Sequence, residues 1–399
     1  MSAGLSSPNP LPRLAGGRND AIDLFRAVTV LVMIVVNDWA SVAGLPAWAR
    51  HMPADADAMS FVDAVFPAFL FIVGLSIPFA LQQRFSAGQP AATVRHVVQR
   101  AGALVLLGFF MVNAEELANP SALPVPPALW ALGSYAGAFL LWGSLQGGPA
   151  LAARWRWLGA ALLAVLALVY RSGDAHAPWM QPHWWGILGL IGWAYLLASA
   201  AYLGARGRLA PLALLLLLCV GYFIAGSAVP AASPYAVLLG QGGHASHTAI
   251  VLAGCMTARL LFDERRAHTV AALVFAVALA LLAMLLQPGW KISKIYATPS
   301  WALYSAAACV VVLVALRFAL QRLPGLRTRL AAWLAPVAAH PLLAYLIPFV
   351  VEALCQLAGV ARPALLRQAP LGIAIALLYA LAVLTATRWL VARGVRLRL

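Results

Sequence analysis

The sequence predicts an all-α integral membrane protein that crosses the bilayer about 11 to 12 times. Hydrophobic residues occupy 63% of the 399 positions and charged residues only 10%, whereas a soluble domain carries about 25% charged residues. Mean hydropathy is +0.87. Apolar stretches of about 20 residues, each long enough to span a bilayer as a helix, recur along the whole chain. The gaps between them are too short for a separate soluble domain.

About twelve apolar segments are expected to span the membrane, and short polar gaps separate them. Residues 1–20 are polar and are expected to form a disordered cytoplasmic lead-in, followed by a single transmembrane domain over residues 21–399. The expected spans lie at residues 22–40, 61–82, 95–114, 125–145, 155–171, 185–204, 209–228, 245–262, 267–287, 299–321, 335–358 and 369–391.

The basic residues predict the orientation of these spans. If the N-terminus lies in the cytoplasm, 21 of the 27 basic residues fall on the cytoplasmic side, as the positive-inside rule requires. The net charge of +15 therefore reflects membrane topology, and nucleic acid is not an expected partner. A secretory signal is the alternative for the first span, because Ser41–Gly44 resembles a cleavage site, but Asp20 and Asp23 before the apolar run disfavour it.

The first span carries charged and amide side chains at both ends. Asp23 and Arg26 are three residues apart, so they share a helix face and are expected to form a structural ion pair at the cytoplasmic end. Asn37 and Asp38 lie at the opposite end of the same helix. Each is compatible with a structural role alone, and Asp38 is also a candidate for binding substrate.

The loop after the first span contains a histidine, His51, and the second span begins near a carboxylate, Asp63. A neutral imidazole can take a proton from an attacking nucleophile, and a carboxylate on its other nitrogen fixes the tautomer. An amide such as Asn37 can stabilise a developing oxyanion. A solvated loop with a helix-capping Asp63 is the structural alternative, and composition alone does not decide between the two.

Two further groups of side chains are candidates for binding substrate. Lys291 and Lys294 are the only lysines in the protein, and both fall on the outer side, against the positive-inside trend. They predict an anion- or sugar-binding rim, with an interfacial belt as the alternative. His244 and His247 follow a glycine pair. No cysteine or carboxylate near them completes a metal site, so no metal is expected.

These stretches resemble the transmembrane acyltransferase family of heparan-α-glucosaminide N-acetyltransferase and its bacterial relatives. "AIDLFRAVTVLVMIVVND" is similar to the opening helix of that family, and "FVDAVFPAFLFIVGLSI" to its Asp-Leu-Val-Phe-Pro signature. "WKISKIYATPSWAL" and "AAHPLLAYLIP" match later motifs less specifically. The loop at His51 departs from the family, because it lacks the usual Trp and Gly after the histidine. The acidic segment before the eighth span is also replaced here, and these departures bear chiefly on the acceptor.

The resemblance implies an enzyme that moves an acetyl group from cytoplasmic acetyl-CoA to an amine or hydroxyl of an extracytoplasmic sugar or glycan. It implies catalytic roles for His51, Asn37 and Asp63. It also implies a place in the bacterial inner membrane and, from a dimer-forming relative, a homodimer. The expected contacts of the CoA phosphates are cytoplasmic arginines, namely Arg84, Arg95, Arg100, Arg259 and Arg265.

Two other functions remain compatible with the sequence. A secondary transporter or flippase for a polar or glycan-lipid substrate could use intramembrane Asp and His for proton coupling, although no inverted repeat is apparent. A polysaccharide O-acetyltransferase would also open its first helix with Asp-x-x-Arg, but Asn37 stands where such enzymes carry a histidine.

Overall fold

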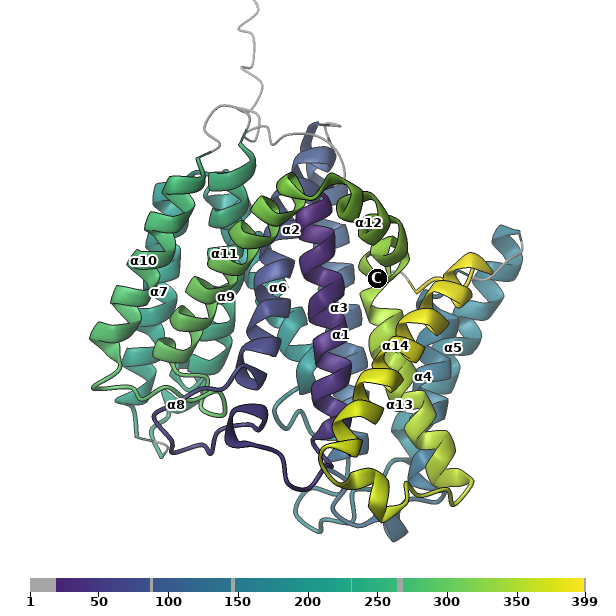
Figure 1. Cartoon of the computed structure of the whole chain (residues 1–399). Coiled ribbons are helices and arrows are strands. Elements are labelled where there is room, and N and C mark those ends of the chain that lie inside the picture. Colours follow the sequence, from purple (N-terminus) through teal and green to yellow (C-terminus); the bar gives the residue numbers. More distant parts are fainter. Residues whose placement is uncertain (1–18, 87–88, 145–147, 231, 264–267, 398–399) are drawn as a thin grey trace, which may run out of the picture. The chain divides into compact units, whose positions relative to one another are not determined.

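The computed structural model describes residues 19–86, 89–144, 148–230, 232–263 and 268–397, and this part of the chain contains helices and no β-strand. The α-helices (Figure 1) are α1 Asp20–Trp39, α2 Val65–Ser86, α3 Pro90–Glu115, α4 Pro127–Trp142, α5 Pro149–Val169, α6 Gly186–Gly204, α7 Leu209–Ser227, α8 Ala236–Leu239, α9 Gly242–Phe262, α10 Thr269–Leu286, α11 Pro299–Arg322, α12 Pro324–Ala339, α13 Pro341–Leu357 and α14 Leu371–Ala392. Short 3₁₀ turns lie at Ala47–Ala49, Val62–Ala64, Pro120–Ala122 and Ala364–Arg367.

The all-α, multi-pass architecture predicted from the sequence is confirmed, and each of the twelve expected spans coincides with a helix. Within the described residues, nine helices are long and apolar enough to cross a membrane, or ten if one bent pair counts as a single span. Helix α1 falls outside this set because Asp23, Arg26 and Asp38 lie within it. Helix α4 falls outside because it has only 16 residues.

The bent pair lies where a proline interrupts the chain. Residues Ala332–Ala339 and Pro341–Leu357 form an angle of 77°. Pro341 has no N–H to continue the preceding helix, and it disfavours helical geometry at the residue before it. His340, with φ −132° and ψ 54°, lies at the break and is buried.

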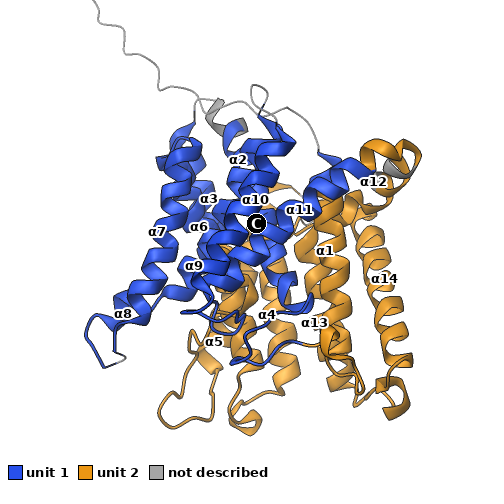
Figure 2. Ribbon diagram, turned by 60° about the vertical axis from the view of Figure 1, so that its left-hand side comes forward, with its two compact units in different colours: residues 1–22, 51–101, 193–319 blue, residues 23–50, 102–192, 320–399 orange. Residues whose placement is uncertain are grey.

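Contacts between Cα atoms divide the chain into two compact units, each built from segments that are separate in the sequence. Unit 1 comprises residues 1–22, 51–101 and 193–319, and unit 2 comprises residues 23–50, 102–192 and 320–399 (Figure 2). Helices α1, α3, α6 and α11 each contribute residues to both units. The single domain expected over residues 21–399 stays a prediction.

Helix α9 forms the centre of unit 1 and packs against α2, α7 and α10. Nearly all of its residues are buried. Gly74 of α2 lies directly against Gly254 of α9, and a Cβ atom at either position would overlap backbone atoms of the other helix. Small residues allow such close backbone approach, which is how apolar helices gain packing energy in a bilayer.

Helices α2 and α9 run in the same direction. Phe66 packs against His247 near the start of both helices, with ring centroids 5.2 Å apart. Phe79, in the second half of α2, packs against Phe262 at the end of α9, with centroids 5.8 Å apart. The N-terminal ends of α2 and α9 therefore lie at the same end of unit 1.

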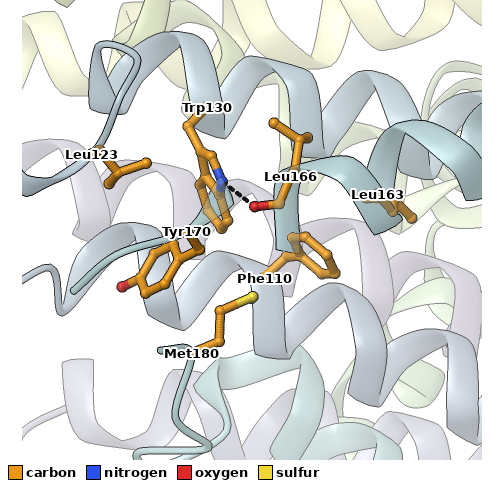
Figure 3. Close-up of a cluster of buried hydrophobic side chains, with 7 residues drawn as sticks. All are labelled: Phe110, Leu123, Trp130, Leu163, Leu166, Tyr170 and Met180. Atoms are coloured by element: carbon orange, nitrogen blue, oxygen red, sulfur yellow. Dashed lines mark hydrogen bonds between the residues drawn. The ribbon is translucent and has the colours of Figure 1, made fainter. Parts of the chain in front are cut away.

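In unit 2, helices α4 and α5 pack together over a cluster of buried aromatic and aliphatic side chains. Figure 3 shows the Trp130 indole lying among these side chains, with its Nε1–H donating to the Leu166 carbonyl at 2.9 Å. Because this bond satisfies the only polar atom of the indole, the ring can be buried at little cost. The cluster comprises Phe110, Leu123, Trp130, Leu163, Leu166, Tyr170 and Met180.

The buried amide of Asn113 ties the end of α3 to the loop that precedes α6. Its Nδ2 donates to the Gln181 carbonyl at 2.8 Å, and its Oδ1 accepts from the Gln181 N–H at 2.9 Å. The Tyr170 hydroxyl donates to the Asn113 carbonyl at 2.9 Å. These bonds pair a loop backbone that would otherwise leave buried polar groups unsatisfied.

We expect Gly74→Ala to destabilise the protein by about 1–3 kcal/mol, because the added methyl group must displace the α9 backbone. Thermal unfolding of the purified protein in detergent measures this as a lower Tm. Gly221→Ala on α7 is the matched control, since no heavy atom lies within 4 Å of the added Cβ. Equal Tm values for the two variants would contradict the proposed close packing of α2 and α9.

Candidate functional site

Asp63 lies in the 3₁₀ turn Val62–Ala64 that leads into α2, and only 1% of its surface is exposed. Its Oδ2 accepts hydrogen bonds from the Ser60 N–H at 3.0 Å, the Ser60 hydroxyl at 3.2 Å and the Met52 N–H at 3.2 Å. These donors stabilise a charge that would otherwise be costly to bury. The carboxylate also holds the loop backbone on either side in place.

The remaining oxygen of Asp63 accepts a hydrogen bond from His51. The distance from His51 Nδ1 to Asp63 Oδ1 is 2.7 Å. Because an ionised carboxylate can only accept, Nδ1 must carry the proton, and the neutral imidazole then presents an unprotonated Nε2. The His51 side chain is 45% exposed, so its imidazole is open to a ligand while Asp63 is not. This geometry suits a general base whose tautomer is fixed by a buried carboxylate.

Lys294 approaches the same imidazole from the loop between α10 and α11. Its Nζ lies 3.3 Å from both His51 Nδ1 and His51 Nε2. Since Nδ1 donates to Asp63, the ammonium can donate only to Nε2. Burial lowers the pKa of Lys294 below the usual lysine range, and the negative charge of Asp63 partly offsets this effect. The lysine predicted to bind substrate therefore contacts the predicted base directly.

Further hydrogen bonds attach the loop around Lys294 to the loop that carries His51. Asp57 accepts from the Ile292 N–H at 2.8 Å and from Gln287 Nε2 at 3.1 Å, and the bond from Ile292 is the main reason that the Asp57 pKa is lowered. The Ser293 hydroxyl donates to the Ala54 carbonyl at 2.7 Å. The sequence identified both loops as polar regions that needed explanation, but it gave no indication that they pair.

A buried tryptophan lies beneath this arrangement. Trp301, at the start of α11, has no exposed surface, and its Nε1–H donates to the Asp63 carbonyl at 3.2 Å. Its ring meets the His247 ring edge-on, with centroids 6.0 Å apart. The tryptophan thus supports the backbone of Asp63 from the interior of unit 1. Sequence reasoning missed this role, because a tryptophan in an apolar span resembles ordinary core.

The other substrate-binding candidates of unit 1 are placed differently. His247 is 5% exposed and packs between Phe66 and Trp301, which indicates a packing residue rather than an open ligand contact. His244 is half-buried, and its ring lies 6.2 Å from that of Trp193. Lys291 is exposed, and its charge acts on Asp57. Only Lys294 of these candidates contacts His51.

The two candidates at the end of α1 belong to unit 2. Asn37 is exposed, and its pairing with His51 stays a prediction. Asp38 was expected to bind substrate, but both of its carboxylate oxygens are held by Arg362, at 2.6 and 2.9 Å. Hydrogen bonding to Asp38 raises the pKa of Arg362 further. This bidentate pair ties α1 to the segment before α14, so Asp38 has a structural partner that the sequence did not reveal.

At the other end of α1, the structure contains the ion pair expected between Asp23 and Arg26, with 3.0 Å between Arg26 Nη1 and Asp23 Oδ1. The same nitrogen donates to the Ala338 carbonyl at 3.1 Å. The pair therefore also satisfies a backbone carbonyl close to the end of α12.

The arginines expected to contact CoA have varied surroundings. Arg259 is 7% exposed, pairs with Asp263 at 2.6 Å and donates to the Gly207 carbonyl, so internal partners occupy its guanidinium. Arg100 lies over the Tyr195 ring, 5.1 Å from its centroid. Arg95 is exposed on α3. The Arg84 side chain and the whole of Arg265 lie outside the described residues.

Within the described ranges, no group of three or more His, Cys, Asp or Glu side chains could hold a metal ion. The side chains that meet at the site are a histidine, a carboxylate and an ammonium group.

Comparison with known proteins gives a match to a family model over part of the chain. Residues 18–199 match the family described as "Domain of unknown function (DUF5009)". The matched region covers fewer than half of the 399 residues; it includes His51 and Asp63 but not Lys294. No curated protein matches the chain significantly.

We expect Asp63→Ala to lower the free energy of unfolding by about 3 kcal/mol, because it leaves the Ser60 and Met52 donors without their shared acceptor. Hydrogen exchange followed by mass spectrometry should show lost protection confined first to residues 51–60. Asp55→Ala in the same loop is the control, because Asp55 is exposed and its loss removes only one acceptor, that of the Tyr296 hydroxyl at 3.2 Å. Equal protection in both variants would show that Asp63 does not organise the loop.

We expect Arg362→Met to cost about 2 kcal/mol, since it leaves the carboxylate of Asp38 partly buried and unpaired. The double variant Arg362→Met/Asp38→Asn should recover part of this loss, because it also removes the unpaired charge. Chemical denaturation of the two variants measures the difference. No recovery in the double variant would show that the ion pair is not the source of the loss.

Proposed function

We propose that this protein is a membrane-embedded acyltransferase that moves an acetyl group from acetyl-CoA to an amine or hydroxyl of a sugar or glycan. The hydrogen bond between His51 Nδ1 and the buried carboxylate of Asp63 is the observation that supports it most directly. A half-exposed imidazole with a fixed tautomer is the general base that such a transfer requires.

In the proposed reaction, the acceptor nitrogen or oxygen attacks the thioester carbonyl carbon. His51 Nε2 takes the proton from that acceptor N–H or O–H as the attack occurs. The bond between that carbon and sulfur then breaks, and the imidazolium returns the proton to the departing CoA thiolate. Asp63 stabilises the imidazolium during these steps. The resemblance suggests Asn37 as a donor to the carbonyl oxygen.

Lys294 is placed to contribute electrostatically to the proposed reaction. Its ammonium lies against the Nε2 edge of His51, where it can also donate to an oxygen that becomes negative in the transition state. A lysine whose pKa is lowered by burial gives up its proton more readily than an exposed one. The ammonium therefore need not block the base throughout the reaction.

The arrangement of unit 1 supports transfer across the bilayer. His51 and Asp63 lie at the N-terminal end of α2, and Arg259 lies at the C-terminal end of the parallel helix α9. A helix of 20 residues spans about 30 Å, the thickness of a hydrocarbon core. We propose that the arginine-rich end faces the cytoplasm with both termini, that the His51 end faces outward, and that the membrane is a bacterial inner membrane holding a homodimer.

A secondary transporter is the second candidate function. The 77° break between α12 and α13 favours it, because discontinuous helices form the substrate sites of many transporters. Consumption of acetyl-CoA separates the two functions, since a transporter would move its substrate without breaking a thioester.

We expect purified protein in liposomes to transfer label from [¹⁴C]acetyl-CoA to an amino sugar, and His51→Ala to reduce the rate by about 10²–10⁴-fold. Asp63→Asn should lower kcat by a similar factor with little change in KM, because it disturbs the tautomer and not the binding of the acceptor. His176→Ala, in an exposed loop of unit 2, is the control and should retain full activity.

Transfer by His51→Ala at the rate of the unaltered protein would refute the catalytic assignment. Absence of any transfer with a panel of amine and hydroxyl acceptors, together with uptake of one of them, would favour the transporter.

A further inference from the structure

The Lys294 ammonium group lies beside a proton acceptor and not beside an acid. Among the residues that the structure describes, it forms no ion pair with a carboxylate, and His51 is the side chain within hydrogen-bond distance of it. Lys294 is half-buried. A lysine that loses contact with water is ordinarily paired with an acidic side chain. Both residues lie in unit 1 (Figure 2), and their contact requires another explanation than charge pairing.

The backbone that carries Lys294 is held in an uncommon conformation. The Ala297 N–H donates to the Lys294 carbonyl at 3.1 Å and closes a turn. Ala297 is buried and has a φ of 48°, which residues other than glycine rarely adopt. The Thr298 N–H donates to the Ser293 carbonyl at 3.1 Å, and the Ser293 N–H donates to the Thr298 hydroxyl at 3.0 Å. Such conformations persist where the surroundings impose them, and they cluster at functional sites.

Lys294, His51 and Asp63 have the order of a nucleophile, a base and an orienting carboxylate. Lys294 Nζ lies 3.3 Å from both ring nitrogens of His51. Nδ1 donates to Asp63 at 2.7 Å, so only Nε2 can take a proton from the ammonium. The carboxylate stabilises the imidazolium that results, as it does in triads whose nucleophile is a serine hydroxyl. Here the amine of Lys294 is the group that becomes nucleophilic.

We propose that Lys294 is a self-acylation site, at which the lysine amine takes an acyl group from a thioester or another activated acyl donor. The inference rests on the proposed function, which identifies His51 as the base and a thioester as the donor. Burial lowers the pKa of Lys294, although the negative charge of Asp63 partly offsets this effect. Because a base lies next to the ammonium and burial makes its proton easier to remove, Lys294 is expected to react faster than an exposed lysine.

The step balances without any oxidant or reductant. His51 Nε2 takes one proton from the Lys294 ammonium, and the neutral amine attacks the acyl carbonyl carbon. A carbon–nitrogen bond forms, the carbon–sulfur bond of the thioester breaks, and the product is an amide. The amide nitrogen keeps one of the three ammonium protons. His51 passes one of the other two to the departing thiolate, and the last one leaves to water.

Self-acylation would close the site to the acceptor. An acceptor N–H or O–H must come within hydrogen-bond distance of His51 Nε2 to give up its proton, and Lys294 Nζ already lies at 3.3 Å from that atom. An amide at Nζ carries no positive charge and keeps this space occupied. We therefore expect acetyl transfer to fall as the acetylated fraction of Lys294 rises, so the lysine slows transfer when the acceptor is scarce.

The test uses the full-length protein in lipid nanodiscs and a small activated ester, p-nitrophenyl acetate, which requires no CoA site. Peptide mass spectrometry follows acetylation at each lysine over time. Lys291 is the internal control, because it is the only other lysine and is exposed. We expect Lys294 to be acetylated at least about tenfold faster than Lys291 in the folded protein, and both to react equally after denaturation. Equal rates in the folded protein, or a faster Lys291, would overturn the proposal.

Variants of the site show whether His51 causes this preference. His51→Ala removes the base, and His51→Gln also removes it while keeping an N–H that can donate to Asp63. Both should abolish the preference for Lys294 over Lys291. Asp55→Ala is the control and should retain the preference, since Asp55 is exposed and its carboxylate accepts from the Tyr296 hydroxyl. A preference that survives in both His51 variants would overturn the proposal, and so would an equal loss in Asp55→Ala.

A parallel experiment with acetyl-CoA in place of the ester separates this inference from the proposed function. Without a sugar acceptor, we expect acetylation at Lys294 and a matching loss of later transfer. Selective reaction with the ester, without any transfer from acetyl-CoA, would refute the enzyme and leave the reactive lysine intact. Transfer to a sugar while Lys294 stays unmodified by both donors would refute self-acylation and leave the enzyme intact.

Discussion

The buried carboxylate of Asp63 is the constraint on which the His51 region depends. Its two oxygens accept from Ser60, Met52 and His51, and its backbone carbonyl accepts from Trp301. A charge so deeply buried persists only when its donors are fixed. The loop must therefore keep one conformation, and the imidazole is held by the same interaction that makes the buried charge tolerable. The hydrogen bonds that stabilise this loop are therefore the same bonds that position the proposed catalytic base.

Hydrogen bonds also hold the facing loop, between α10 and α11, in place. Asp57 and Ala54 accept hydrogen bonds from the segment between α10 and α11, which places Lys294 beside the imidazole. The Asp57 contacts are exposed to solvent, so their main effect is to hold the two loops together. The imidazole therefore lies between a carboxylate at Nδ1 and an ammonium group at Nε2.

Unit 2 pairs its buried polar groups with internal partners. Asp38 with Arg362, and Asn113 with Gln181, form complete pairs and behave as structural ties. Each of these polar groups has a partner at hydrogen-bond distance, so its burial costs little free energy.

The sequence by itself determined the helical class and the approximate positions of the membrane-spanning helices, because bilayer thickness acts on local sequence. It also identified His51 and Asp63 as residues that need explanation, because a charge near an apolar segment is costly. It also placed Asp23 and Arg26 on one face, since helical spacing is a local property. Only the tertiary structure brought Lys294 to His51, Trp301 to Asp63 and Arg362 to Asp38. These partners are separated by more than 230 residues, and no periodicity records which helix ends meet.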